Sequence, residues 1–303
     1  MKKVTNNLNS PINGILLLNK AQGMTSNKAL QKAKNLFGAK KAGHSGSLDP
    51  LATGMLPVCF GEATKICQYL LDADKCYQTT GLLGIKTNTA DSTGEIISQT
   101  EEFFVSQDEL KGALQQYLGH SKQVPSMFSA LKHNGVPLYR LARNGIEIER
   151  EARDIQISQL DLTQFDGNNF SLTVTCSKGT YIRNLVEDIG ETIGIGAHVT
   201  QLHRVYTAGF ETSAMYTLDE LATMTPSQRM NCLISMDRAI NYLPFITLSA
   251  EEINAIRQGR IVRCSESMNE NENVRLYNEQ MQFIGIGEYF NQCQIKAKRL
   301  MAF

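Results

Sequence analysis

A glycine-rich loop around the first acidic residue of the chain restricts both the local structure and the chemistry. Residues 43–54 read Gly-His-Ser-Gly-Ser-Leu-Asp-Pro-Leu-Ala-Thr-Gly. Three glycines and a proline within twelve residues interrupt regular helix and strand, so we expect a loop. Asp49, at its centre, follows eight lysines and no other acid. A carboxylate so placed suits chemistry on a polyanion, but Asp before Pro is also common in turns, and the loop alone leaves both interpretations open.

The charge distribution has the same asymmetry on a larger scale. The chain has 30 basic and 30 acidic residues, a formal net charge of zero. Residues 1–48 nevertheless carry eight lysines and no acid, whereas residues 49–120 carry ten acids and four lysines. This permits a basic face that binds phosphates, since only the local charge matters there. A solvated, lysine-rich helix would produce the same count.

The composition is that of a globular protein from a reducing compartment. Of the 303 residues, 42% are hydrophobic, and the longest aliphatic run, Ile15 to Leu18, is far too short to cross a bilayer. The N-terminus lacks the apolar core of a signal peptide. Seven dispersed cysteines without a Cys-x-x-Cys pair indicate neither a disulfide framework nor a zinc knuckle. We therefore expect a cytoplasmic protein with no membrane association.

Hydrophobic periodicity predicts alternating strands and helices. Thr25 or Ser26 can cap a helix, Ser106 and Glu109 form a capping box for a helix ending near Gly119, and Thr180 can cap another helix ending near Gly194. Residues 217–241 read as helical, and a small β-rich domain follows Pro244. Further expected elements are strands at 12–18, 77–83, 94–98, 152–162, 170–176 and 198–206, the pair 77–83 and 94–98 being joined by a polar turn, and a helix at 62–71.

Residues 120–151 combine basic and aromatic side chains in a stretch rich in Pro and Gly. The pattern predicts an irregular insertion with one short helix near Leu138 to Asn144. Basic residues next to aromatic ones can pair with phosphates and stack on bases, as a loop that grips nucleic acid requires. A surface loop with a small hydrophobic core of its own, and no role in binding nucleic acid, explains the pattern equally well. The residues concerned are Phe128, Lys132, His133, Tyr139, Arg140 and Arg143.

Five motifs together resemble one known family. The loop Gly43–Gly54 is similar to the catalytic loop of the TruB family of tRNA pseudouridine synthases. Lys75-Cys76-Tyr77, the segment Ser177–Arg183 and Leu202-His203-Arg204 resemble its later motifs, in the family's order. Gln123-Val124-Pro125-Ser126-Met127-Phe128-Ser129-Ala130 onward resembles its RNA-gripping insertion, and the C-terminal segment resembles a PUA-type module. Departures are Ala21, where proline is common, and Ser45 and Ser47, where threonine and alanine are frequent.

The resemblance implies an α+β pseudouridine-synthase fold with a mixed, largely antiparallel central sheet flanked by helices. It implies a catalytic domain over residues 1–243, containing the insertion at about 120–151, and a small PUA-type RNA-binding domain over 244–303. The implied reaction converts the uridine at position 55, in the T-arm loop of tRNA, into pseudouridine. Because the base is only moved from N1 to C5 and nothing is oxidised, no cofactor or metal is expected, and no protein partner is implied.

The resemblance also assigns roles to six residues. Asp49 would be the essential carboxylate and would pair with Arg183, while Tyr77 would stack on the target base and take or relay the C5 proton. Tyr181 and Leu202 would line the uracil pocket. His44 would fill the space left by a flipped base, although its intrinsic pKa also permits acid–base chemistry. Taken without the family, Tyr77, Tyr181 and Leu202 are typical of core or near-core residues, and Arg183 of a surface helix residue.

Three other functions stay open on the sequence. A non-catalytic RNA-binding or tRNA-folding protein could use the same scaffold. A nucleoside hydrolase or glycosidase could use Asp49, although that chemistry usually needs a second carboxylate or a metal. A related enzyme could work with guide RNA inside a larger complex, but the insertion within this short chain favours a stand-alone protein.

Overall fold

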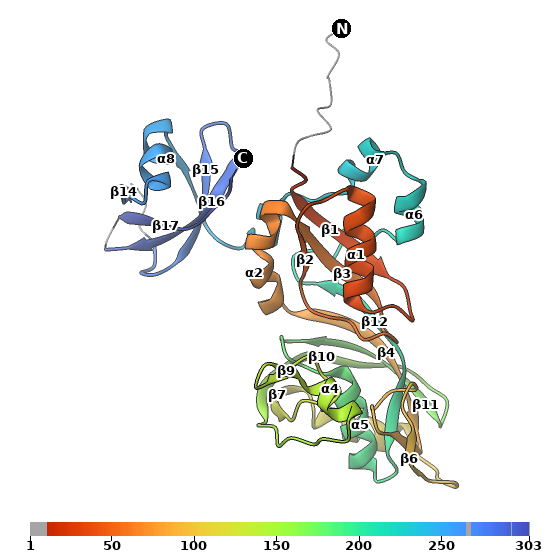
Figure 1. The fold of residues 1–303 in the computed structure, drawn as a ribbon. Helices are drawn as coiled ribbons and strands as arrows, with labels where there is room; N and C mark the ends of the chain where they lie inside the picture. The colour runs from red at the N-terminus through yellow and green to blue at the C-terminus, as the bar shows by residue number, and fades with distance from the viewer. Residues whose placement is uncertain (1–10, 265–267, 292, 303) are drawn as a thin grey trace.

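The computed structural model describes residues 11–264, 268–291 and 293–302, so Lys2 and Lys3 of the basic segment lie outside it. A large sheet forms its centre (Figure 1). Its strands are β1 (Gly14–Lys20), β2 (Ala42–His44), β3 (Thr53–Phe60), β4 (Lys75–Leu83), β7 (Gly119–Gln123), β10 (Arg153–Phe165), β11 (Asn169–Cys176) and β12 (Ala197–Thr207).

The strand order is β1-β3-β12-β4-β11-β10-β7, with β2 paired to β3. Strand β12 runs parallel to β3, and the other pairs of this sheet are antiparallel. The prediction of a mixed, largely antiparallel α+β sheet is therefore confirmed. The order also brings β3, which follows the Asp49 loop, beside β12 from much later in the chain.

Helix α1 (Ser26–Phe37) matches its sequence pattern closely. The Thr25 hydroxyl caps it by accepting from the amide of Lys28, and Gly38, in the left-handed conformation, ends it. Its apolar residues Ala29, Leu30, Ala33 and Phe37 are buried and Leu36 is half-buried, while Lys28 and Lys32 are exposed. The two lysines are therefore on the solvent side of the helix, as the sequence pattern predicts, which both a phosphate-binding face and a solvated helix allow.

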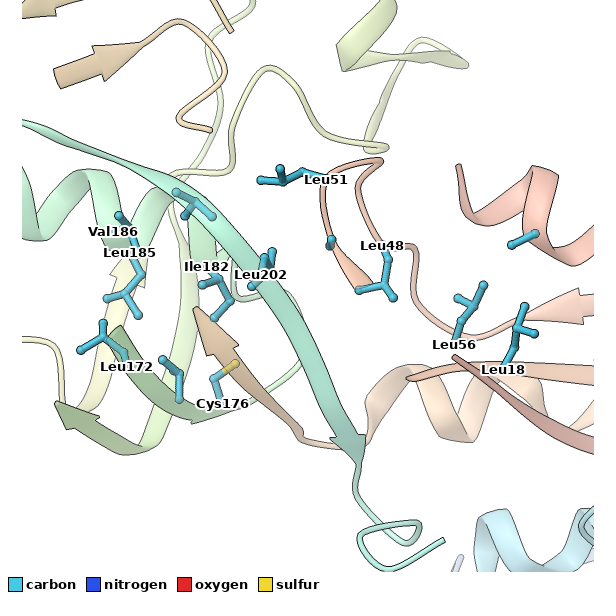
Figure 2. Close-up of a cluster of buried hydrophobic side chains, with 14 of the residues drawn as sticks. Leu18, Leu48, Leu51, Leu56, Leu172, Cys176, Ile182, Leu185, Val186 and Leu202 are labelled. Carbon is cyan, nitrogen blue, oxygen red and sulfur yellow. The ribbon is translucent and has the colours of Figure 1, made fainter. Parts of the chain in front are cut away.

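A second helix layer lies on the other half of the sheet. Helix α5 (Ile182–Ile193) packs against β12 and β4, and α3 (Gln107–Gln115) packs beside α5, starting at the predicted Ser106 capping box but ending before Gly119. Figure 2 shows the apolar cluster beneath α5 continuing past Leu202 toward Leu48 and Leu51 of the Asp49 loop. The loop and the N-terminus of α5 thus share one hydrophobic core.

Three predicted helices differ from the structure. The helix expected at 62–71 is divided into a 3₁₀ turn (Gly61–Lys65) and α2 (Cys67–Asp72). The helical stretch 217–241 is divided into α6 (Leu218–Thr223), α7 (Pro226–Asn231) and a 3₁₀ turn (Met236–Ile240), because Thr225 and Pro226 start a new capped helix. The predicted Thr180 cap is wrong: its hydroxyl donates to the Ser177 carbonyl, and Tyr181 is the N-cap of α5.

The two strands expected at 77–83 and 94–98 do not pair with each other. Strand β6 (Ile96–Gln99) pairs with β5 (Ile85–Thr87) in a separate two-stranded sheet, whereas β4 pairs with β11 and β12. The reason is that Gly84, with φ +81°, turns the chain out of the large sheet directly after β4. The turn after β5 is thereby directed toward the N-terminus of α5.

The predicted insertion is mostly irregular, with a small hairpin of β8 (Lys132–His133) and β9 (Val136–Pro137) followed by α4 (Leu138–Arg143). The short helix predicted near Leu138 to Asn144 is confirmed. The first residues of the insertion are regular rather than irregular, because β7 extends to Gln123 and pairs with β10 at the edge of the large sheet. The insertion is therefore anchored directly to the sheet.

A five-stranded sheet with one helix follows the linker at residue 244, in agreement with the β-rich segment expected there. Tyr277 donates to Asp237 at 2.6 Å, and Lys65 donates to the Leu300 carbonyl at 2.8 Å, so polar contacts join this unit to the rest. No helix within the described residues is long and apolar enough to cross a membrane. The elements are β13 (Phe245–Leu248), α8 (Ala250–Arg257), β14 (Val262–Arg263), β15 (Asn273–Asn278), β16 (Phe283–Phe290) and β17 (Gln294–Leu300).

Candidate active site

Two buried polar side chains hold the loop that carries Asp49. The hydroxyl of Ser26, at the start of α1, donates to the Leu48 carbonyl at 2.9 Å and accepts from the Leu48 amide at 2.7 Å. From the opposite strand, Arg204 donates through Nε to the Met55 carbonyl and through Nη2 to the Gly46 carbonyl. Both ends of the loop are thereby tied to regular structure, and the position of Asp49 between them is restricted.

Gly54 permits the close contact between the loop strand and β12. Its φ of +97° belongs to the left-handed region, and a Cβ there would lie 2.2 Å from the carbonyl oxygen of Arg204. Glycine is therefore required both by the backbone conformation and by the neighbouring strand. This approach explains why β12, with Leu202 and Arg204, reaches the Asp49 loop.

Asp49 and Arg183 form the central ion pair of the site. Arg183 Nε lies 2.8 Å from Asp49 Oδ2, and the guanidinium also donates to the carbonyls of Thr89 at 2.7 Å and Phe128 at 2.9 Å. The Arg183 side chain is only 4% exposed, whereas 39% of the Asp49 side chain is accessible. A rigid buried cation thus orients a carboxylate that a substrate can reach.

Asp91 is a site residue that sequence reasoning missed. It lies in the turn after β5, is buried, and has Oδ2 3.8 Å from Arg183 Nη1. Its other oxygen accepts from the hydroxyls of Thr89 and Thr93 and from the Thr93 amide. Arg183 therefore stands between two carboxylates. In sequence Asp91 is one acid among ten in an acidic segment, and nothing local distinguishes it.

Opposing electrostatic effects act on Asp49. Burial raises the pKa of its carboxyl above the ordinary value; Arg183 and, more weakly, Lys20 oppose this, while the charge of Asp91 adds to it. Lys20 is itself buried, donates to the carbonyls of Ala21 and Met24, and has a pKa lowered by burial to about 8. The protonation of Asp49 therefore depends on the cations that surround it.

The two tyrosines and Leu202 adjoin this ion pair. Tyr77, on β4 opposite Arg204, and Tyr181, at the N-cap of α5, both lie within electrostatic range of Asp49, and burial raises the pKa of each phenol. Leu202 is buried on β12 between the loop and α5 (Figure 2). The structure thus gathers Asp49, Tyr77, Tyr181, Arg183 and Leu202, predicted from four separate motifs, at one place.

His44 lies at the end of β2 and is not paired with the carboxylate of Asp49. Within the described part of the chain it makes no hydrogen bond or ion pair with Asp49, and its buried Nδ1 has no hydrogen-bond partner. Burial and the nearby Arg204 lower the pKa of the imidazole below its ordinary value. The ring is therefore neutral at neutral pH. Among residues 11–264, 268–291 and 293–302 no three potential metal ligands are grouped together.

Comparison with known proteins gives a consistent result along the chain. Family profiles match over residues 34–182 (TruB family pseudouridylate synthase, N-terminal domain), 183–241 (tRNA pseudouridylate synthase B C-terminal domain) and 244–301 (pseudouridine synthase II TruB, C-terminal). A tRNA pseudouridine synthase B of Legionella pneumophila (strain Lens) is 68% identical over 292 residues, covering 96% of each chain. The chain belongs to the TruB family. The resemblance noted from five motifs is confirmed.

More distant members of the comparison preserve the TruB architecture. A tRNA pseudouridine synthase B of Neisseria meningitidis serogroup A is 48% identical over 96% of this chain and 95% of its own. Among solved structures, an H/ACA RNP bound to a substrate RNA containing 2′-deoxyuridine aligns with a TM-score of 0.72 at 20% identity, over 96% of this chain and 85% of that one. An archaeal box H/ACA sRNP Nop10–Cbf5 complex aligns with a TM-score of 0.71 at 20% identity, over 97% of this chain and 89% of that one. At this identity the two structures establish the TruB fold alone.

Proposed function

We propose that this TruB-family protein isomerises uridine to pseudouridine in tRNA, at position 55 of the T-arm loop. The observation that carries the proposal is the accessible Asp49 carboxylate, fixed by the buried Arg183 next to Tyr77, Tyr181 and Leu202. The high identity to proteins named tRNA pseudouridine synthase B supports tRNA as the substrate. The motif resemblance supports the T-arm position.

Asp49 is the group that acts on the nucleoside. It either bonds covalently to the ribose or uracil, or stabilises positive charge on the sugar while the N1–C1′ bond breaks. The new bond joins C5 to C1′, and the C5 proton must then leave. Tyr77 is assigned to stack on the base, and burial raises the pKa of its phenol. We therefore assign Tyr77 to relaying that proton rather than to acting as a phenolate base.

His44 serves base flipping in this mechanism. A stacked uridine must leave its loop to reach Asp49, which costs a few kcal/mol. A neutral, flat imidazole without a hydrogen bond to Asp49 is suited to stacking on the RNA that remains. The lowered pKa argues against His44 as a proton donor at neutral pH.

RNA binding is assigned to two exposed basic surfaces and to the C-terminal unit. Lys28 and Lys32 are exposed on α1, and Arg140 and Arg143 are exposed on α4, where Arg143 lies 5.6 Å from the ring centroid of Tyr139. Phosphates and loop shape would be read by these groups, with few contacts to base edges. The unit from residue 244 on is proposed as the PUA-type RNA-binding domain.

Tritium release from a T-arm stem-loop labelled at C5 of uridine tests the proposal. The native protein should release tritium, and Asp49→Asn, nearly identical in shape, should reduce the rate by at least about a thousandfold. A non-catalytic RNA-binding or tRNA-folding protein is the alternative that the same scaffold supports. That alternative predicts RNA binding without release, so an inactive native protein that binds the stem-loop overturns the enzyme assignment.

A further inference from the structure

Gln123, the last residue of β7, holds the backbone of Tyr181 through two hydrogen bonds. Its Oε1 accepts from the Tyr181 amide at 2.8 Å, and its Nε2 donates to the Tyr181 carbonyl at 3.1 Å. The side chain is buried, at 6% exposure. Two bonds to one residue fix the direction of both adjoining peptide groups, much as a neighbouring strand does.

Helix α5 has a particular need for this contact. Tyr181 is its N-cap, and no side chain accepts from the first turn in the usual manner. Thr180, the residue that sequence pattern favours as a cap, donates to Ser177 instead. An unpaired amide at a part-buried helix start would cost roughly 1–3 kcal/mol. Gln123, 58 positions away in sequence, satisfies the amide of the N-cap residue, as the N3 Glu or Gln does in a capping box.

The same short segment after β7 continues along the first turn of α5. The Val124 carbonyl accepts from Asn184 Nδ2 at 3.1 Å, and the Phe128 carbonyl accepts from Arg183 Nη2 at 2.9 Å. Residues 123–128 therefore hydrogen-bond to Tyr181, Arg183 and Asn184, at the helix end that faces Asp49. The start of the insertion is part of the wall of the site as well as its connection to the sheet.

We propose that Gln123 is a positioning residue for the reaction. By clamping Tyr181 it keeps the Tyr181 ring and, two residues later, the Arg183 guanidinium aligned with Asp49. The inference rests on the proposed function. A shift of about 1 Å in such a group costs about a hundredfold in rate, although nothing has been removed from the reacting centre.

Gln123→Met is the decisive variant, because methionine fills a similar volume and makes neither hydrogen bond. Gln123→Glu keeps the acceptor and loses the donor. Gln156→Ala is the control, an exposed glutamine on the adjoining strand β10. Single-turnover tritium release is measured as a function of pH, and binding of the stem-loop is measured in an Asp49→Asn background. Thermal unfolding of each full-length variant is followed by circular dichroism.

We expect Gln123→Met to lower the single-turnover rate about thirtyfold to a hundredfold, with the RNA Kd within about threefold of the parent. Because Arg183 lowers the pKa of Asp49, its displacement should also move the acid limb of the rate profile to higher pH. Gln123→Glu should fall between native and Gln123→Met, and Gln156→Ala should match the native protein.

A native rate in Gln123→Met overturns the inference and leaves the proposed function intact. The inference is also overturned if Gln123→Met loses rate, RNA affinity and thermal stability to equal extents and the acid limb does not move. Such a result would mean that Gln123 only supports the folded structure. If the native protein itself releases no tritium, the proposed function and this inference both fail.

Discussion

Arg183 Nε donates to Asp49 Oδ2 across 2.8 Å, while the carbonyls of Thr89 and Phe128 fix the same guanidinium from behind. One residue thus connects the Asp49 loop, the turn after β5 and the insertion. The cation faces a carboxyl whose pKa burial raises, so it favours the ionised form that the proposed chemistry requires.

Arg183→Lys tests how far the ionisation of Asp49 depends on the guanidinium of Arg183. Lysine keeps the charge, but its single ammonium nitrogen cannot span the three acceptors that the guanidinium reaches through Nε, Nη1 and Nη2, so we expect the single-turnover rate to fall about a hundredfold. Loss of the hydrogen bond from Arg183 should raise the pKa of Asp49 further. The acid limb of the rate profile, where activity falls as Asp49 is protonated, should therefore move to higher pH. The measurement is the pH profile of tritium release; an unchanged acid limb would separate Arg183 from the ionisation of Asp49.

Asp91→Asn should move the acid limb of the pH–rate profile to lower pH, opposite to the effect of Arg183→Lys. The charge of Asp91 raises the pKa of Asp49, so its removal lowers that pKa and extends activity to lower pH. The plateau rate should drop by at least about tenfold, because Arg183 loses its second carboxylate. An acid limb at higher pH would instead mean that Asp91 acts mainly by holding Arg183 in place.

His44→Phe should retain activity within about tenfold of native, because a phenyl ring can also stack in the vacated space. His44→Ala, without a ring, should lose considerably more. The measurements are the steady-state rate on the T-arm stem-loop and the affinity for that RNA, for both variants and the native protein. If His44→Phe is inactive while binding normally, the imidazole takes part in proton transfer and the stacking role is wrong.

Arg140→Gln/Arg143→Gln should weaken stem-loop binding through lost phosphate contacts. The slope of log Kd against log salt concentration should decrease in magnitude by about 1.5. Lys111→Gln serves as the control, because it removes an exposed charge from α3 and leaves those of α1 and α4 in place. Equal effects in the two proteins would argue against a specific role for the insertion.

Gly54→Ala should destabilise the fold by more than about 3 kcal/mol, because the new Cβ would meet the Arg204 backbone at 2.2 Å. Gly23→Ala is the matched control: its φ is also positive, but no atom lies within 4 Å of the added Cβ. That variant should lose only about 1 kcal/mol. Chemical denaturation of both proteins measures the difference.

Sequence reasoning was most reliable where a pattern depended on near neighbours. The caps at Thr25 and Ser106 form as predicted, and so do the strands with alternating apolar residues. It was least reliable where a distant segment supplied the partner. Thr180 has the chemistry of a cap, but it bonds to Ser177, and the amide at the start of α5 is paired with the distant Gln123. Strand β6 is the next strand predicted after β4, but it pairs with β5.

By itself, the sequence determined the family and the residues to examine, because the motifs around Asp49, Tyr77, Arg183 and Leu202 follow one another in a recognisable order. Only the tertiary structure decided how those residues are held. Asp91 at Arg183, Arg204 beneath the loop and Gln123 at Tyr181 are buried polar partners whose interactions cross between strands and turns far apart in the chain. Burial strengthens such interactions, and burial is a property of the fold that no local pattern contains.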